Sequence, residues 1–154
     1  MKYFIALDTK DYTLKKGITP VSLTWKYQTI SDWTRGLNFT NIDIVIGHSL
    51  GAAVALIVSE KTPPKELHLY SPSPFFTETL HLLDKQDLKY IGKKRLKEMK
   101  SLPRVTCPIF LYIGVDEDPR MILNGLRLWY NMANIKLIFC AGNHQTVIHN
   151  GILA

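Results

Sequence analysis

Short apolar runs rich in β-branched and aromatic residues alternate along this chain with longer segments of helical periodicity. The densest run, residues 42–46, has the pattern of a strand that is buried on both faces of a sheet. Strands are predicted at residues 3–7, 21–27, 42–46, 67–70, 108–114 and 135–140, and helices at residues 29–37, 49–60, 77–102, 123–132 and 145–153. This alternation predicts an α/β fold, a three-layer α/β/α sandwich with a mostly parallel sheet of about six strands.

Capping and breaking residues set the limits of some of these helices. Ser31 is the expected N-cap of the helix at residues 29–37. Gly92 is expected to divide the charged segment 77–102 into two helices. In an open parallel sheet, ligands bind beyond the carboxyl ends of the strands, so the residues that directly follow each predicted strand are the candidates for function.

The size, composition and charge of the chain limit the kinds of protein it can be and the partners it can bind. Its 154 residues are 46% hydrophobic and 21% charged, which predicts a single globular domain over residues 1–154. The net charge is +6, and most of the excess lies between Lys85 and Arg104. Few aromatic residues are interleaved with these lysines, so nucleic-acid binding is not expected. We expect the lysine-rich face to be solvated, and contact with anionic lipid or an acidic substrate is the alternative.

No sequence pattern indicates a membrane span, a metal site or a cofactor. The apolar run near the N-terminus is too short for a signal peptide, and no run reaches the roughly 20 apolar residues of a membrane helix. We therefore expect a cytoplasmic protein without stable membrane insertion. Cys107 and Cys140 are predicted to be small buried hydrophobic residues without a bridge between them. The sequence has no phosphate-binding loop, dinucleotide fingerprint or paired-cysteine motif.

The segment at residues 47–51 reads Gly-His-Ser-Leu-Gly and lies between the strand at residues 42–46 and an apolar helix. It is a G-x-S-x-G motif in a strand–turn–helix setting, where the turn is sharp and a side chain at either glycine would collide with neighbouring elements. The amide of Leu50 at the start of the helix favours negative charge. Ser49 is therefore the candidate nucleophile, and a turn that only caps a helix is the alternative.

With this motif in place, the chain resembles the α/β-hydrolase superfamily from its first predicted strand to its last. Members of that superfamily order their catalytic residues as serine, then aspartate or glutamate, then histidine. The acid follows a late strand and the histidine follows the final one. The usual leading strands have no counterpart in this chain, so the resemblance implies a minimal version of the fold.

The resemblance places the base in the turn after the last strand, which reads Ala-Gly-Asn-His at residues 141–144. Superfamily members often have a glycine directly before the histidine, and Asn143 stands there in this chain. His144 is the candidate base, because a histidine titrates in the range that suits proton acceptance from Ser49 and proton donation to a leaving group. His149 is the spare candidate.

Three carboxylates compete for the role of the acid, because the strand at residues 108–114 is followed by Val-Asp-Glu-Asp-Pro. The superfamily commonly has Asp-Pro a few residues after such a strand, and this similarity favours Asp118. The spacing is longer than usual, which keeps Asp116 as the alternative, and Glu117 is the least favoured. The acid must hold the imidazole in one tautomer and stabilise its cation.

The resemblance also implies the groups that surround the reacting bond. Leu50 supplies one oxyanion donor, and the second is expected from the backbone of Thr9 or Lys10, whose loop lacks the His-Gly common in the superfamily. Residues 77–104 occupy the place where relatives insert a lid. Core packing is the alternative for two of the three candidate substrate contacts, the phenylalanines, and a structural role inside the turn is the alternative for the third, a histidine. These contacts are His48, Phe75 and Phe76.

The implied activity is that of a serine hydrolase. Such an enzyme cleaves a carboxylic ester or a related acyl bond of a small molecule through a Ser-His-Asp triad and an acyl-enzyme. A thioesterase or an acyltransferase would use the same residues, and a non-catalytic binding module on this fold is the alternative from another class. Because the segment 77–104 offers few lid residues, we expect small or short-chain acyl groups.

Overall fold

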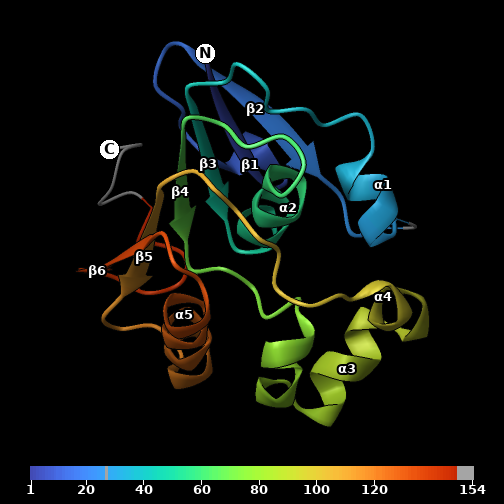
Figure 1. Ribbon diagram of the computed structural model, residues 1–154. Coiled ribbons are helices and arrows are strands. Elements are labelled where there is room, and N and C mark those ends of the chain that lie inside the picture. The colour runs from blue at the N-terminus through green and yellow to red at the C-terminus, as the bar shows by residue number, and fades with distance from the viewer. Residues whose placement is uncertain (27, 149–154) are drawn as a thin grey trace.

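The computed structural model describes residues 1–26 and 28–148. The strands are β1 (Lys2–Leu7), β2 (Ile18–Leu23), β3 (Ile44–His48), β4 (Glu66–Tyr70), β5 (Ile109–Gly114) and β6 (Ile135–Cys140). The α-helices are α1 (Ile30–Thr34), α2 (Leu50–Ser59), α3 (Lys85–Ile91), α4 (Lys93–Glu98) and α5 (Pro119–Asn131), and the 3-10 helices are η1 (Thr9–Asp11) and η2 (Thr77–Leu82) (Figure 1).

The six strands form one sheet in the order β2-β1-β3-β4-β5-β6, and every neighbouring pair is parallel. The predicted α/β fold with about six strands is confirmed. After β1 the chain adds β2 on one side and then crosses to β3 on the other side of β1. The strand order therefore reverses between β1 and β3, and such a reversal is where open parallel sheets bind their ligands.

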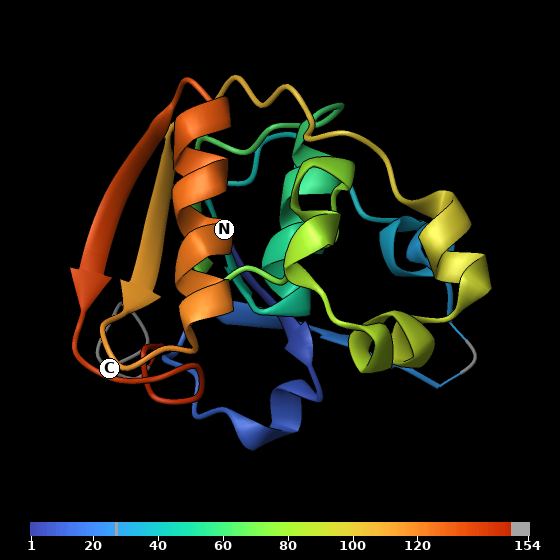
Figure 2. The ribbon, with the colours of Figure 1, turned by 90° about the horizontal axis from the view of Figure 1, so that it is seen from below.

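One face of the sheet carries the helices and most of the hydrophobic core. Helix α2 packs against β1 and β3, and α5 packs against β5 and β6. All residues of α2 except Ile57 are buried, as its almost uniformly apolar sequence indicates. The core beneath these helices includes Ile5, Val45, Leu69 and Leu111. Figure 2, which views the molecule from below, shows these helices together on one side of the sheet.

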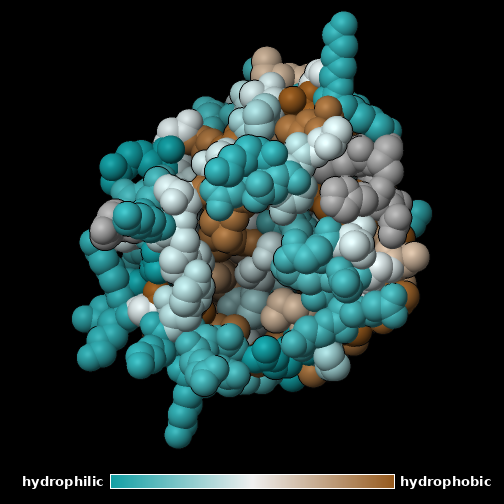
Figure 3. All heavy atoms as spheres, turned by 180° about the vertical axis from the view of Figure 1, so that it is seen from behind, coloured by the Kyte–Doolittle hydropathy of each residue, from teal (hydrophilic) through white to brown (hydrophobic). Residues whose placement is uncertain are grey.

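The opposite face of the sheet has a smaller core centred on Phe4, Ile46 and Tyr70. In the described part of the chain, 3-10 helix η1 and turns cover this face, where the predicted sandwich has an α-helix. Residues 145–148 of the helix predicted at 145–153 form turns, and the remaining residues lie outside the described part. Figure 3 shows the molecule from behind, where hydrophilic residues surround a hollow with hydrophobic residues inside it.

Two helices begin at other residues than predicted, and capping explains both. Thr29, not Ser31, is the N-cap of α1, because Thr29 and Asp32 exchange the reciprocal hydrogen bonds of a capping box. Helix α5 begins at Pro119, four residues before the predicted start at residue 123, because the Asp118 side chain caps it and a proline suits the first helical position. Strand β2 lies earlier than the predicted 21–27.

The segment 77–104 consists of η2, α3 and α4, and Gly92 separates the two α-helices as predicted. Gly92 has φ 84°, a conformation that glycine adopts at no steric cost. The lysines of this segment are exposed, in agreement with a solvated face. The Glu98 carboxylate at the end of α4 accepts hydrogen bonds from the Ile30 amide and the Ser31 hydroxyl, which fixes α4 to α1.

Cys107 is buried, Cys140 is half-buried, and both are free thiols. Burial raises the pKa of Cys107 to about 11, so this thiol behaves as a small hydrophobic residue, as predicted. A search of the helices in the described residues finds none with the length and apolar character needed to cross a membrane.

Candidate active site

Ser49 stands at the sharp turn between β3 and α2 with φ 54° and ψ −116°, a conformation that residues other than glycine rarely adopt. The turn is tight because the helix starts directly against the sheet. A Cβ atom added at Gly47 would lie 2.6 Å from the Ala52 Cα, and one at Gly51 would overlap the carbonyl group of Ile5 on β1. Both glycines of the motif are therefore required by packing, as the sequence predicts.

Backbone hydrogen bonds hold this strained turn in place. The Ser49 amide donates to the Tyr70 carbonyl at 3.0 Å, and the Ser49 carbonyl accepts from the Ser73 amide at 3.1 Å. Tyr70 is the last residue of β4, the neighbouring strand, and Ser73 lies in the loop that follows it. The serine hydroxyl is therefore presented at the carboxyl edge of the sheet, where the sequence predicts the site.

The structure brings His144 to Ser49 from 95 residues further along the chain. The Nε2 atom of His144 lies 2.9 Å from the Ser49 Oγ. The Nδ1 atom lies 3.1 Å and 3.2 Å from the two carboxylate oxygens of Glu117. A carboxylate only accepts hydrogen bonds, so the proton of the neutral ring is on Nδ1, and Nε2 accepts the Ser49 proton. The spare candidate, His149, lies outside the described residues.

The acid beside His144 is Glu117, which corrects the prediction of Asp118 and its alternative Asp116. The Asp118 carboxylate accepts from the Arg120 amide at 2.8 Å as the N-cap of α5, and it faces the Arg120 guanidinium in solvent. Asp116 is exposed, and no hydrogen bond joins its carboxylate to His144. The Asp-Pro pair is thus a helix-start signal. Once Asp118 is assigned as the helix cap, the preceding carboxylate, Glu117, is the candidate for the acid.

Glu117 is buried and has a second hydrogen-bond donor. The Ser71 hydroxyl donates to Glu117 Oε2 at 2.6 Å, and both residues are buried. Ser71 has φ 43°, so its backbone is strained at the end of β4, where it supplies this hydrogen bond. Burial raises the pKa of Glu117, but the hydrogen bonds from His144 and Ser71 outweigh it and hold the pKa below its usual value. Glu117 is therefore ionised at neutral pH.

His48, predicted to contact substrate, is buried and braces the loop of His144. Its Nε2 atom lies 2.7 Å from the His144 carbonyl oxygen, and its Nδ1 atom lies 2.7 Å from the Tyr12 hydroxyl. A carbonyl oxygen only accepts, so Nε2 carries the proton of the neutral ring and Nδ1 accepts from Tyr12. Both ring nitrogens are thereby used within the protein, which favours the structural role that the sequence offered as the alternative to a substrate contact.

Asn143 holds the turn that presents His144, although it departs from the superfamily's usual glycine. Its Oδ1 atom accepts from the amides of Gln145 and Thr146 at 2.9 Å and 3.1 Å. The Asn143 amide in turn donates to the Thr146 hydroxyl at 2.9 Å. This asparagine turn fixes the backbone on both sides of the imidazole.

The structure separates the predicted oxyanion donors. Leu50 is the first residue of α2, where the amide has no acceptor within the helix and stands beside Ser49. The Thr9 amide donates to the Ser22 hydroxyl at 3.1 Å, so it is not available at the site. Lys10 lies in η1 and lines neither of the two cavities that reach Ser49.

Two cavities meet at Ser49 and His144. The larger has a volume of about 400 Å³ and lies between the sheet edge, α3 and α5. Its apolar wall includes Leu7, Trp25, Leu50, Pro74, Phe75, Leu83, Ile91 and Met121. The smaller has a volume of about 340 Å³ and a more polar wall that includes Asp8, Asp11, Tyr12, Gln145 and Thr146. Ser49 is therefore accessible from an apolar side and from a polar side.

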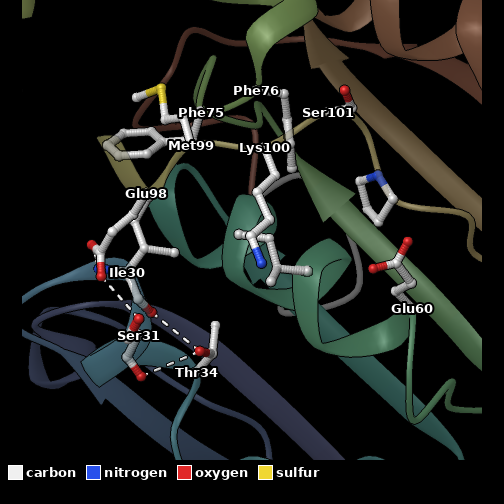
Figure 4. Close-up of a pocket in the computed structure, with 12 residues that line it drawn as sticks. Ile30, Ser31, Thr34, Glu60, Phe75, Phe76, Glu98, Met99, Lys100 and Ser101 are labelled. Atoms are coloured by element: carbon white, nitrogen blue, oxygen red, sulfur yellow. Dashed lines mark hydrogen bonds between the residues drawn. The ribbon is translucent and has the colours of Figure 1, made fainter. Parts of the chain in front are cut away.

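Of the two predicted phenylalanine contacts, only Phe75 reaches the site. Phe75 lines the apolar cavity at Ser49 and also a separate cavity of about 190 Å³ between α1, α2 and residues 98–103. Figure 4 shows this separate cavity, with Phe75 and Phe76 beside Met99 and Lys100. Phe76 lines the separate cavity but not the cavity at Ser49. It belongs to the core, which is the alternative that the sequence left open.

Helix α3 closes over the apolar cavity and is fixed at both ends. At one end the Arg120 guanidinium lies 2.7 Å from the Asp87 carboxylate and 3.6 Å from that of Asp84. At the other end the Tyr90 ring stacks on Trp25 with a centroid distance of 4.8 Å. The segment thus occupies the place of the predicted lid.

Comparison with known proteins rests on structure, since no family model and no curated protein matches the sequence. MGS-MChE2, an α/β-hydrolase enzyme from the metagenome of lagoon sediments of Mar Chica, Morocco, is 17% identical, with a TM-score of 0.63 over 97% of this chain and 85% of that one. A protein of Agrobacterium vitis S4, described as a hydrolase, is 14% identical, with a TM-score of 0.60 over 82% of this chain and 65% of that one.

The Vlm2 thioesterase domain is 17% identical, with a TM-score of 0.57 over 94% of this chain and 84% of that one. At these identities the likeness concerns the backbone. It agrees with the parallel strand order and with the nucleophile turn between β3 and α2. The chain therefore has the α/β-hydrolase fold.

Proposed function

We propose that this protein is a serine hydrolase that cleaves a carboxylic ester or a related acyl bond of a small molecule. The observation that carries the proposal is the continuous hydrogen-bonded row from the Ser49 hydroxyl through His144 to the buried Glu117 carboxylate. A catalytic triad needs this order of nucleophile, base and acid. The α/β-hydrolase fold of the neighbours adds support.

Acylation begins when the Ser49 Oγ attacks the carbonyl carbon of the substrate and its proton passes to Nε2 of His144. The electron pair of the carbonyl double bond moves to the oxygen, which the Leu50 amide at the start of α2 stabilises. The His144 cation is stabilised by Glu117, because the Nδ1 proton stays hydrogen-bonded to this carboxylate. The bond to the leaving group then breaks, and His144 returns the proton to that group.

Deacylation repeats these steps with water as the nucleophile. His144 accepts a proton from the water, the acid product forms, and Ser49 Oγ takes the proton back as the acyl–oxygen bond breaks. The apolar cavity of about 400 Å³ beside Leu50 suits an acyl group of modest size. This supports the expectation of small or short-chain acyl substrates.

The test is hydrolysis of p-nitrophenyl esters from acetate to palmitate by the wild type and by Ser49→Ala. We expect kcat of Ser49→Ala to fall about 10⁴-fold or more, because the nucleophile is lost. Ser101→Ala, which removes a hydroxyl from an exposed position away from the site, is the matched control and should retain wild-type kcat. The series should be turned over fastest at short chains.

Acyl thioesters of the same chain lengths extend the assay, since a thioesterase would use the same residues and one structural neighbour is a thioesterase domain. A preference for thioesters would change the leaving group of the proposal and keep its mechanism. Folded wild-type protein that turns over neither series and does not react with a fluorophosphonate would favour a non-catalytic binding module.

A further inference from the structure

Ser73 carries a hydroxyl group directly beside the nucleophile, and the triad leaves it without a role. Its Oγ lies 3.1 Å from the Ser49 Oγ. Ser73 follows β4, is half-buried and lines the apolar cavity at Ser49. Its backbone is fixed, because the Ser73 amide donates to the Ser49 carbonyl and the Ser73 carbonyl accepts from the Phe75 amide. The two hydroxyl groups are therefore held together by the fold.

The direction of the hydrogen bond between these two hydroxyls follows from counting protons. Glu117 fixes the Nδ1 proton of His144, so the Nε2 atom of the neutral ring is an acceptor. The single proton of Ser49 is then donated to Nε2, at 2.9 Å. Ser49 Oγ has no second proton, so in the contact between the two serines Ser73 must be the donor.

We propose that Ser73 is a further catalytic residue, whose hydroxyl donates a hydrogen bond to the Ser49 Oγ throughout the reaction; this inference rests on the proposed serine hydrolase function. As the Ser49 proton leaves for His144, negative charge builds on Oγ, and a hydrogen bond to a charged acceptor is stronger than one to a neutral acceptor. Ser73 therefore stabilises the transition state more than the ground state, which is the condition for catalysis.

The same hydrogen bond acts again in deacylation. Ser49 Oγ is then the leaving group, and negative charge returns to it while the acyl–oxygen bond breaks. The Ser73 hydroxyl donates to Oγ until His144 has returned its proton. Ser73 keeps its own proton in both steps, so it forms no covalent bond to the substrate.

A hydrogen bond from helix α5 helps to fix the position of Ser73. The Asn124 side-chain amide donates to the carbonyl oxygen of Pro72, the residue before Ser73, at 2.6 Å, and Asn124 is fully buried. Ser71, one residue earlier, is held by its hydrogen bond to Glu117. The two residues that precede Ser73 are thus both attached to the protein, which gives the hydroxyl a defined orientation toward Ser49.

The experiment compares the wild type with Ser73→Ala, Ser73→Thr and the control Ser101→Ala. It measures the second-order rate constant for labelling of Ser49 by a fluorophosphonate, with the labelled residue identified by mass spectrometry. Ester hydrolysis supplies kcat and KM separately, and thermal unfolding supplies Tm. Labelling reports the reactivity of Ser49 without requiring the natural substrate.

We expect Ser73→Ala to lower the labelling rate constant and kcat about 10²-fold, the lower end of the loss on removing one oxyanion donor, with KM and Tm unchanged. Ser73→Thr retains the hydroxyl and should recover most of the loss. A rate constant for Ser73→Ala equal to that of the wild type would overturn the role of Ser73 and leave the triad intact. A loss in Ser73→Ala that follows a lowered Tm and is not rescued by threonine would also overturn it.

Two further outcomes are decisive. Labelling of Ser73 in Ser49→Ala would make Ser73 a nucleophile and would contradict the donor role. Absence of labelling in the folded wild type would refute the serine hydrolase function, and the role of Ser73 would fall with it. A rate loss confined to Ser73→Ala, with Ser49 labelled in the wild type, is the one pattern that supports the inference.

Discussion

The carboxyl edge of the sheet and the segment 77–104 lie on opposite sides of the same apolar cavity, and they are built in different ways. At the sheet edge, Ser49, Glu117 and His144 are held by buried and half-buried hydrogen bonds, and Ser49 and Ser71 stand in strained backbone turns. The segment 77–104 consists of three short helices, of which α4 is held by the hydrogen bonds of Glu98 and α3, which covers the cavity, is fixed at its ends by exposed ion pairs and by a ring stack. The three side chains of the proposed triad thus stand on a rigid frame, while α3 on the opposite wall is attached at its ends by contacts that are individually weak.

The contrast between the two regions indicates where substitutions should act. Changes at the sheet edge should affect the chemical step or the fold itself, because buried polar networks have no solvent to replace a lost partner. Changes in the segment 77–104 should affect access to the cavity and should depend on ionic strength. Three predictions test this contrast, in order of decreasing expected effect.

The largest effect is expected for the acid of the triad. Glu117→Gln keeps the shape of the side chain and removes its charge, so the His144 tautomer and cation lose their support, and kcat for ester hydrolysis should fall about 10⁴-fold. Asp118→Asn is the matched control, because asparagine caps a helix as well as aspartate does. It should keep kcat within a few-fold of the wild type. A larger loss for Asp118→Asn than for Glu117→Gln would reverse the assignment of the acid.

Replacing one glycine by alanine in each region should lower the stability of the protein by different amounts. Gly51→Ala places a Cβ against the backbone of β1, which cannot move without disturbing the sheet, so the free energy of unfolding should fall by about 3 kcal/mol or more. Gly92→Ala has open space around its Cβ and is strained only by its backbone conformation, with φ 84° and ψ 154°, so a loss of about 1–2 kcal/mol is expected. Urea denaturation measures both values. Equal losses would remove the contrast between the two regions.

The smallest effect is expected at the ion pairs that hold α3. Arg120 is partly exposed, and Arg120→Gln should lower the free energy of unfolding by less than about 1 kcal/mol. Because α3 then covers the cavity less firmly, KM for the esters should rise while kcat stays within two-fold. This outcome is expected when the substrate and the transition state lose about the same binding free energy. Both differences should vanish at about 1 M salt. Lys97→Gln, on the exposed face of α4, serves as the control for the change of charge.

The sequence allowed the fold and two residues of the site to be predicted for clear physical reasons. The alternation of β-rich runs and helical segments predicts a parallel sheet, and the nucleophile turn needs glycines wherever a helix starts so close to a strand. Ser49 and His144 could be placed because each directly follows a strand. In the structure they meet across 95 residues because the turn after β6 reaches back past the ends of β5 and β4 to the end of β3.

Glu117 was not favoured as the acid because the neighbouring Asp-Pro dipeptide fits two different sequence patterns. Asp118-Pro119 is similar to a superfamily pattern, but it is also the start signal of α5, and the capping role uses the Asp118 carboxylate. Contacts between distant side chains could not be predicted either. The hydrogen bonds of Ser71 with Glu117 and of Tyr12 with His48 depend on register and rotamers, which no local pattern encodes. The same holds for Thr9, whose amide is used by Ser22 on the adjacent strand.

The brace from Tyr12 through His48 to the carbonyl of His144 joins an early part of the chain to a late one. During synthesis the ribosome releases the nucleophile turn long before the turn that carries the base. A nascent chain therefore displays Ser49 for the time needed to add roughly 95 residues, about 5–20 s at ordinary elongation rates, without a base to activate it. The proposed hydrolytic activity is consequently acquired only when the turn after the last strand has docked, so on this proposal the emerging polypeptide is chemically silent during translation.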